Sequence, residues 1–310
     1  MIYKIYKMSF PNGIHIGKNN LHDAEMTICA DTLFSAICLE IIEKSMEEFE
    51  MFLGKVSDGK IVFSDMLPYC GDTYYMPKPV IKINSTEVQA DLSLRKAYKK
   101  LTYIPIDKIG EYLNGTLDLR QEESVISNDI GKKDVRTCVS INDEEEPVPF
   151  RVGTYSFRNE SGLYVLVGCE DVKDISALDE YMTALGYSGI GGKRKSGLGR
   201  FAWKEGKISE ELLNRLTKSH DKYVSLSCAL PKDEELEDAL DNAGYLLIKR
   251  SGFVASKECY NENLKKKDVY LLQSGSCFSN KFNGSIIDVS NGGNHPVYRY
   301  AKPIFLGVNL

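Results

Sequence analysis

The most distinctive segment of the chain runs Gly189-Ile190-Gly191-Gly192-Lys193-Arg194-Lys195-Ser196-Gly197-Leu198-Gly199-Arg200-Phe201. It holds five glycines and four basic residues without one acid. Glycine allows positive φ and a close approach of the backbone to a ligand. Backbone N–H groups in such a loop can form an anion-binding nest, and Lys and Arg complement phosphate charge. The segment therefore predicts phosphate-backbone binding, and the alternative is a tight helix-to-strand turn with solvated charges.

Two nucleotide-binding motifs can be tested on this loop. A Walker A motif requires Ser or Thr directly after its Lys, but Arg194 follows Lys193. The stretch 197–202 matches G-x-G-x-x-(G/A), yet the residues around it have the pattern of a strand where that fingerprint needs a helix. A nucleotide-dependent enzyme is therefore only a third hypothesis for the function.

The pattern outside the loop alternates strands and helices. We predict strands at 2–10, 162–168 and 200–203, and helices at 30–49, with Asp31 as cap, and 175–185, ending at Gly186. Between them, residues 76–153 mix basic, acidic and turn-forming stretches, which is typical of a long insertion with partial order. This order fits a ferredoxin-like unit with one strand hidden before the insertion.

A second unit follows a polar link at 204–222. It begins with a predicted strand at 223–230, a helix with an acidic face at 233–243 and a strand at 244–249. We therefore expect an α+β protein with two ferredoxin-like (RRM-like) domains. The first spans 1–205, with a thumb-type insertion at about 80–155 and the glycine-rich loop at 189–200, and the second spans 220–310.

Composition and charge restrict the class of protein. The chain has 310 residues, 43% of them hydrophobic and 27% charged, which excludes a disordered chain. Its net charge of −5 argues against a globally basic nucleic-acid binder, but the surplus acids lie at 143–146 and 233–241. RNA would therefore be held along a confined basic track.

Targeting and cysteine patterns indicate a cytoplasmic protein without a metal. The first ten residues are too charged for a signal peptide, and no apolar run reaches the ~18–20 residues of a membrane span. Eight cysteines occur without a C-x-x-C pair, so buried reduced thiols are the favoured interpretation and no metal or cofactor is expected.

The glycine-rich loop resembles that of the RAMP superfamily of CRISPR proteins. An ordered set of segments resembles, more specifically, the type III-A (Csm complex) subunits that cap the 5′ tag of crRNA. These segments are FPNGIHIG (10–17), ADTLFSA (30–36), YMPKP (75–79), KRSGFV (249–254), SGSCF (274–278) and HPVYRYAKP (295–303). The resemblance implies a non-catalytic subunit with two RRM-like folds. It also implies three partners: the crRNA 5′ tag, a large polymerase/cyclase-like subunit and a backbone RAMP subunit.

Further RNA-binding candidates follow from the resemblance and the residue types. In the glycine-rich loop they are Gly191, Gly192, Lys193, Arg194, Lys195, Ser196, Gly197 and Gly199, and in the early loop they are His15, Gly17 and Lys18. Arg136 and Thr137 resemble the start of a thumb-like hairpin, which continues into the acidic run 143–146. Because acids repel phosphate, its tip should point away from RNA or toward a basic partner. The alternative is an ordinary surface hairpin.

Three assignments remain open at this stage. His15 could contact RNA or play a structural role, or it could act as general acid/base in a metal-independent crRNA-processing endoribonuclease. Arg250, with Ser251 and Gly252, could contact a phosphate or base, or form a salt bridge at a strand end. Aromatic candidates for base stacking are Tyr98, Tyr103, Phe157 and Tyr187.

Overall fold

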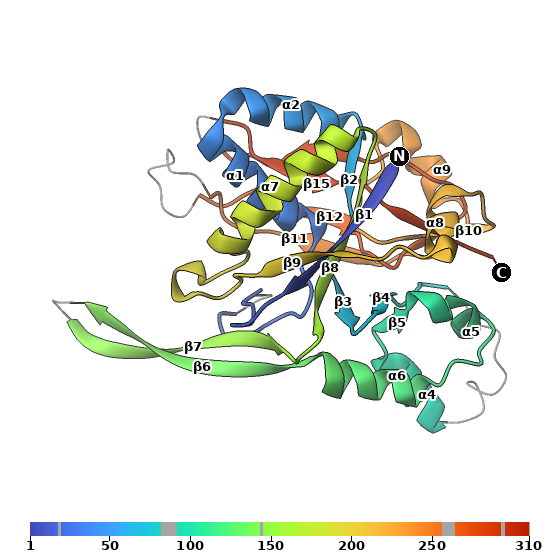
Figure 1. The fold of residues 1–310 in the computed structure, drawn as a ribbon, viewed down its shortest axis with the longest axis horizontal. Coiled ribbons are helices and arrows are strands. Elements are labelled where there is room, and N and C mark those ends of the chain that lie inside the picture. Colours follow the sequence, from blue (N-terminus) through green and yellow to red (C-terminus); the bar gives the residue numbers. More distant parts are fainter. Residues whose placement is uncertain (18–19, 82–91, 143–144, 256–263, 293–294, 310) are drawn as a thin grey trace.

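The computed structural model describes residues 1–17, 20–81, 92–142, 145–255, 264–292 and 295–309 (Figure 1). Helices and strands are mixed along the chain, so the expected α+β class is confirmed. A seven-stranded antiparallel sheet forms its centre. In order across the sheet, six of its strands are β5 (Tyr103–Pro105), β4 (Thr73–Pro77), β3 (Leu67–Cys70), β8 (Ser161–Cys169), β1 (Ile2–Ser9) and β9 (Ala202–Gly206). The seventh, β2 (Ile61–Phe63), pairs with β8.

Both faces of this sheet are buried. On one face Leu163 and Val165 of β8 pack in a core cluster with α1 (Ala30–Lys44) and α7 (Val172–Ser188). On the other face Tyr164 and Leu166 pack with residues of the C-terminal part of the chain. Each large side chain that is fully buried contributes about 1.5–3 kcal/mol. Because β8 is covered on both faces, its sequence is a continuous apolar run and does not alternate with polar residues.

The predicted helix at 30–49 is wrong in its extent. It is divided into α1 and α2 (Met46–Ser57) by Ser45, which is extended and whose Oγ accepts a hydrogen bond from the Glu48 N–H. A serine in this position caps a new helix instead of continuing the old one. Asp31 is not the cap of α1 either: Cys29 takes that position, and the Ala30 N–H donates to Asp65 Oδ1 at 2.8 Å.

The helix predicted at 175–185 is longer than expected. It ends at Ser188 and is followed by Gly189, whose φ is +79°, while Gly186 lies inside the helix. A Cβ on Gly186 would lie 2.5 Å from the Phe201 carbonyl oxygen, so the glycine is needed for close packing and not as a helix end. The Gly186 carbonyl accepts a hydrogen bond from the Phe201 N–H, which brings the chain after the glycine-rich loop back against α7.

The polar stretch 204–222 is more than a link. It holds α8 (Glu210–Thr217), which Ser209 caps by accepting a hydrogen bond from the Leu212 N–H. Leu212 and Leu216 point into the core from one side of this short helix. Because the exposed face of this helix is polar, the average polarity of the stretch resembles that of a linker, and the sequence pattern does not predict a helix.

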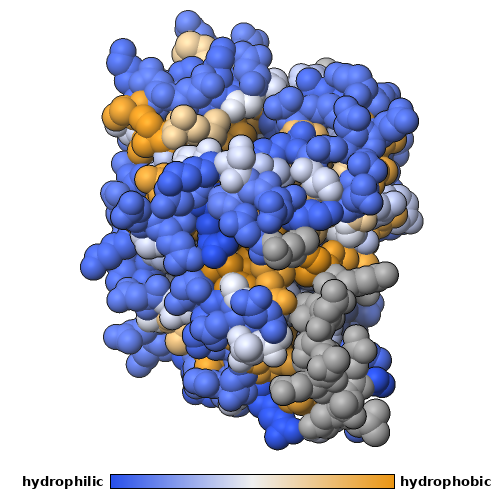
Figure 2. All heavy atoms as spheres, turned by 90° about the vertical axis from the view of Figure 1, so that its right-hand side faces the viewer, coloured by the Kyte–Doolittle hydropathy of each residue, from blue (hydrophilic) through white to orange (hydrophobic). Residues whose placement is uncertain are grey.

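The insertion contains ordered helices and a long hairpin. Its further elements are α4 (Leu92–Lys100), α5 (Ile109–Leu113), α6 (Leu119–Val125), β6 (Gly131–Asn142) and β7 (Glu145–Phe157). Figure 1 shows the β6–β7 hairpin projecting from the body. In Figure 2, which faces the right-hand side of Figure 1, apolar side chains gather across the middle between hydrophilic parts above and below.

The C-terminal part forms smaller sheets. Its strands are β10 (Lys222–Ser225), β13 (Cys277–Phe278) and β16 (Phe305–Val308) in one sheet, and the pairs β11 (Leu247–Arg250) with β12 (Val269–Leu272) and β14 (Ser285–Asp288) with β15 (Tyr298–Ala301). The strand predicted at 223–230 ends early, because Ser225 Oγ donates to the Ser227 carbonyl. The helix predicted at 233–243 is only a 3₁₀ turn, Asp233–Glu235, and α9 (Leu236–Leu240).

A buried carboxylate joins the two parts of the chain. Asp31 at the start of α1 accepts hydrogen bonds from Arg250 of β11, at 2.7 Å from Nη2 and 3.0 Å from Nε, and from Arg299 of β15. Burial alone would raise the pKa of Asp31. The opposite charges and hydrogen bonds of Arg250 and Arg299 outweigh this effect and hold its pKa below the usual value.

Removal of the Asp31 charge should destabilise the protein strongly. We expect Asp31→Asn to lower the free energy of unfolding by about 3–5 kcal/mol, because two guanidinium groups lose their buried counter-charge. Urea unfolding followed by circular dichroism measures this change. Asp58→Asn is a matched control, since Asp58 pairs with Lys60 at the exposed surface and should have little effect. Equal effects of the two substitutions would contradict the role of Asp31.

The ion pairs of Asp31 with Arg250 and Arg299 also predict that the stability of the protein depends on pH. A carboxyl whose folded pKa is depressed contributes stability above its unfolded pKa, about 3.9, and this contribution is lost as pH falls through the folded value. We therefore expect the wild type to lose more unfolding free energy on acidification below about pH 4 than Asp31→Asn loses.

Candidate RNA-binding surface

The glycines of the loop serve close packing. Gly191 and Gly199 have positive φ of +90° and +77°. A Cβ on Gly199 would lie 1.9 Å from the Ile190 carbonyl oxygen, and one on Gly191 would lie 2.8 Å from the His15 carbonyl oxygen. The loop therefore folds tightly on itself and against the early loop 10–17.

Several loop amides are already used inside the protein. The N–H of Gly192 donates to the His15 carbonyl and that of Gly199 to the Gly13 carbonyl, both at 2.9 Å, and the Gly197 N–H donates to the Arg194 carbonyl. These three amides cannot at the same time bind an anion, so the expected backbone nest is wrong for them. Phosphate recognition by this loop would fall to its side chains.

The basic side chains lie on the outside of the loop. Lys193 has the left-handed φ of +58°, and a single 3₁₀ turn, Arg194–Ser196, follows it. Lys193, Arg194 and Lys195 are exposed, and within the described part of the chain none of them pairs with a carboxylate. The Lys193 Nζ lies 4.7 Å from the ring centroid of Phe150 on β7. This cation–π contact places the Lys193 side chain against the hairpin. We call Lys193, Arg194 and Lys195 the basic turn.

His15 is buried and forms part of the support under the loop. Its side chain is 6% exposed, and Nδ1 lies 2.6 Å from the Gly153 carbonyl of β7. A carbonyl oxygen only accepts, so Nδ1 carries the proton of this hydrogen bond. This geometry favours the structural alternative for His15. Gly17 is exposed beside it, and Lys18 lies outside the described residues.

The middle of the β6–β7 hairpin lies next to the same loops. Arg136 on β6 donates from Nη2 to the Asn12 carbonyl at 3.1 Å, and the Asn12 side chain donates to the Gly197 carbonyl at 3.2 Å. Thr137 stands opposite Arg151 on β7, and both are exposed. Residues 143–144 of the acidic run lie outside the described residues. The structure therefore brings together the early loop, the glycine-rich loop and the middle of the hairpin.

Some residues of this surface carry no local signal in the sequence. Asn12 connects two loops through contacts to residues more than a hundred positions away. Phe150 joins the surface only because folding brings its ring under the Lys193 ammonium group. Tyr187, one of the predicted stacking candidates, is 78% exposed at the end of α7, just before the loop.

Arg250 does not belong to this surface. Its guanidinium is bound to Asp31, so the salt-bridge alternative is the one observed. The Ser251 carbonyl accepts a hydrogen bond from Arg299, and the Gly252 carbonyl accepts one from the Lys266 N–H. The physical reason for the wrong expectation is that the partner, Asp31, lies 219 positions away in the chain. Arg250, Ser251 and Gly252 therefore have internal partners, and their expected contact with RNA rests on the resemblance alone.

The nucleotide fingerprint at 197–202 fails in the structure too. The residues after it form β9 and not a helix, so no helix N-terminus is available for a pyrophosphate there.

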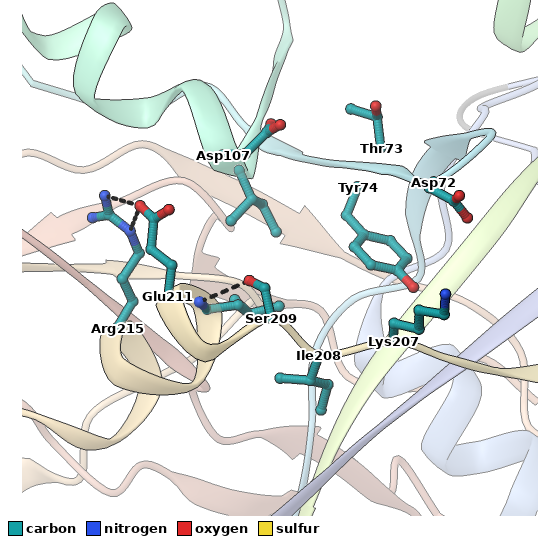
Figure 3. Close-up of a pocket in the computed structure, with 11 residues that line it drawn as sticks. Asp72, Thr73, Tyr74, Asp107, Lys207, Ile208, Ser209, Glu211 and Arg215 are labelled. Carbon is teal, nitrogen blue, oxygen red and sulfur yellow. Dashed lines mark hydrogen bonds and ion pairs between the residues drawn. The ribbon is translucent and has the colours of Figure 1, made fainter.

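A pocket of about 410 Å³ lies elsewhere, between β4, the 3₁₀ turn Ile106–Lys108 and α8 (Figure 3). Its lining includes Tyr74, whose hydroxyl points toward Lys207, and the ion pair of Glu211 with Arg215. None of its lining residues is among the predicted RNA-binding residues. Three acids (Asp72, Asp107 and Glu211) outnumber two bases (Lys207 and Arg215) along its wall, so it offers no phosphate-selective charge.

The family is decided by comparison with known proteins. The family model of the CRISPR Csm4 C-terminal domain matches residues 218–308. A CRISPR system Cms protein Csm4 of Streptococcus thermophilus is 36% identical over 318 residues, covering 100% of both chains. The chain belongs to the Csm4 family. Another Csm4, of Mycobacterium tuberculosis, is 35% identical over 98% of this chain and 97% of its own.

Solved structures agree with the fold of this Csm4-family chain. A chain of the crystal structure of a Csm3–Csm4 subcomplex in the type III-A CRISPR-Cas interference complex superimposes with a TM-score of 0.68 at 20% identity, covering 99% of this chain and 100% of that chain. A Csm1–Csm4 cassette in complex with cA4 gives a TM-score of 0.58 at 22% identity, with 100% and 99% covered. Among the described residues of the Csm4-family chain, no helix is long and apolar enough to cross a membrane.

The packing of the glycine-rich loop can be tested with a pair of glycine substitutions. We expect Gly199→Ala to lower the free energy of unfolding by more than about 1 kcal/mol, because the new Cβ meets the Ile190 carbonyl and φ is positive. Gly54→Ala in α2 is the control. Its Cβ would meet nothing within 4 Å, so we expect an unchanged or higher stability. Chemical unfolding of both variants gives the answer, and a neutral Gly199→Ala would contradict the close packing.

Proposed function

We propose that this Csm4-family chain is a non-catalytic crRNA-binding subunit of a type III-A CRISPR interference complex. In this role it holds the 5′ repeat-derived tag and links the large subunit to the backbone filament in antiviral defence. The observation that carries the proposal is the basic turn, which is exposed and free of carboxylate partners among the described residues. Its Lys193 side chain lies over the ring of Phe150 on β7, and Arg136 of the same hairpin bonds the neighbouring loop at the Asn12 carbonyl.

The chemistry of this surface suits single-stranded RNA. Phosphate contacts from Lys193, Arg194 and Lys195 would fix the register of the tag. The exposed ring of Tyr187 offers a stacking platform for a base, worth about 1–3 kcal/mol. The acids of 233–241 lie in another part of the chain and would leave RNA confined to the basic track.

The strand order supports an RRM-like first domain at 1–205. The order β9-β1-β8-β3, with α1 and α7 packed on one face, corresponds to a βαββαβ unit. The β6–β7 hairpin would then be the thumb-type insertion. For a second domain at 220–310, the order β13-β10-β16 provides weaker support, because α9 is the single α-helix in its described residues.

The partners follow from the solved relatives. One relative was solved in a Csm3–Csm4 subcomplex and others in Csm1–Csm4 cassettes. We propose that the chain uses a Csm1-type protein as the large polymerase/cyclase-like subunit and a Csm3-type protein as the backbone RAMP subunit, in the cytoplasm.

Charge reversal of the basic turn tests the RNA assignment. We expect replacement of Lys193, Arg194 and Lys195 by Glu to weaken binding of tag-containing RNA to the assembled complex at least about tenfold. Each lost phosphate contact should also lower the slope of log affinity against log salt by about 0.7. A filter-binding titration at several salt concentrations measures both quantities.

A matched control separates local contacts from general charge. Replacement of Lys96, Lys99 and Lys100 of α4 by Glu makes the same charge change at another exposed site. We expect it to change the affinity about twofold or less, since charges beyond a Debye length are screened. Equal losses in the two triple variants would reject the basic turn as the RNA contact.

The endoribonuclease alternative has a separate test. Because the His15 ring is buried and hydrogen-bonded to Gly153, we expect no cleavage of repeat RNA in EDTA. Instead, His15→Ala should lower the free energy of unfolding by at least about 1 kcal/mol through the lost buried hydrogen bond. Gel analysis of the RNA and urea unfolding measure the two effects. A product formed by the wild type but not by His15→Ala would establish the enzyme.

A further inference from the structure

Two thiols and a carboxylate meet where the two parts of the chain join. Cys29 precedes α1, Asp65 lies between β2 and β3, and Cys228 follows β10. The Sγ atoms of Cys29 and Cys228 are 3.8 Å apart, and Cys228 Sγ is 3.5 Å from Asp65 Oδ2. The three donor atoms all lie within 4.8 Å of one another.

These separations match the edges of a tetrahedral zinc site. With a Zn–S bond of about 2.3 Å and a Zn–O bond of about 2.0 Å, tetrahedral geometry gives about 3.8 Å between two sulfurs and about 3.5 Å between sulfur and oxygen. A disulfide would instead require the sulfurs to lie about 2.05 Å apart. The observed spacing excludes a disulfide. It is that of thiol hydrogen bonds from Cys228 to Cys29 and Asp65, and equally that of three ligands around one zinc ion.

Neighbouring groups orient the three side chains. Asp65 Oδ1 accepts hydrogen bonds from the Ala30 N–H at 2.8 Å and the Cys228 N–H at 3.2 Å, which turns Oδ2 toward the thiol of Cys228. The Cys228 thiol also lies within hydrogen-bond distance of the Cys29 sulfur. Such outer contacts hold ligands in place at metal sites.

The cluster lies beside the buried ion pairs of Asp31 with Arg250 and Arg299. Lys266 is a further cation near Asp31 and the two arginines. The proposal therefore depends on the geometry of the three donor atoms.

We propose that Cys29, Asp65 and Cys228 bind one Zn²⁺ ion. Soft thiolates with one carboxylate select zinc over Mg²⁺ or Ca²⁺. In zinc sites with three protein ligands, water takes the fourth position. The ion clamps the start of α1 to the segment after β10, next to the Asp31 ion pairs, and its binding does not depend on the proposed RNA function.

The test uses the full chain purified without chelator in a reducing, oxygen-free buffer. After incubation with Zn²⁺ and desalting, the metal content is measured by mass spectrometry. We expect one Zn²⁺ per chain in the wild type and in Cys38→Ser and Cys169→Ser, whose thiols are buried elsewhere. Cys29→Ser, Cys228→Ser and Asp65→Asn should each lose most of it. Because Cys29 is half-buried, its serine variant should keep the fold, which circular dichroism checks.

A second measurement does not depend on any variant that could fail to fold. Co²⁺ added to the metal-free wild type should produce a thiolate-to-cobalt charge-transfer band in the near ultraviolet, and Zn²⁺ should remove it. The absence of this band, a wild type without zinc, or unchanged zinc in Cys29→Ser would each overturn the proposal. A Cys29–Cys228 disulfide that forms without loss of any bound zinc would overturn it as well.

Discussion

The contact between Asp31 and the two arginines Arg250 and Arg299 is the constraint on which the arrangement of the chain depends. A carboxylate at the start of α1 is buried and can stay charged only because both guanidinium groups reach it. Since the arginines come from β11 and β15, the pair fixes the C-terminal strands against the helices that cover the main sheet. The Cys29, Asp65 and Cys228 cluster lies at the same junction. The polar groups buried there thus find their partners on the other part of the chain.

The glycine-rich loop illustrates how one sequence feature can have two physical causes. Its glycines are required because backbone approaches backbone, as the space around Gly199 and Gly191 makes clear. Its basic residues are a separate feature, because they are exposed and nothing in the packing needs their charge. The tight base formed with His15 and Asn12 holds the basic turn in a defined position. A rigid support of this kind reduces the entropy that ordering of the turn on an RNA backbone would cost.

The acidic net charge of −5 and an RNA-binding role are compatible for the same reason. Screening limits the reach of an exposed charge to about 10 Å at 0.1 M salt, so the local set of charges decides what a surface attracts. Lys193, Arg194 and Lys195 form one such local set beside the hairpin, and the acids at 233–241 belong to a different part of the chain. The net charge is a sum over the whole protein, so it does not describe the charge of any single surface.

The sequence by itself determined the α+β class, the position of β1 and β8, the exposed basic turn and the family resemblance, because each follows from local periodicity, local charge or short ordered motifs. Contacts between distant positions lay beyond it. Only the tertiary structure decided that Arg250 binds Asp31 and that His15 supports the loop from below. It likewise showed that loop amides are used internally and that Ser45 separates two helices. The physical reason is that a side chain's chemistry is set by the partner it meets after folding, and these partners are brought close by long-range packing that no local pattern encodes.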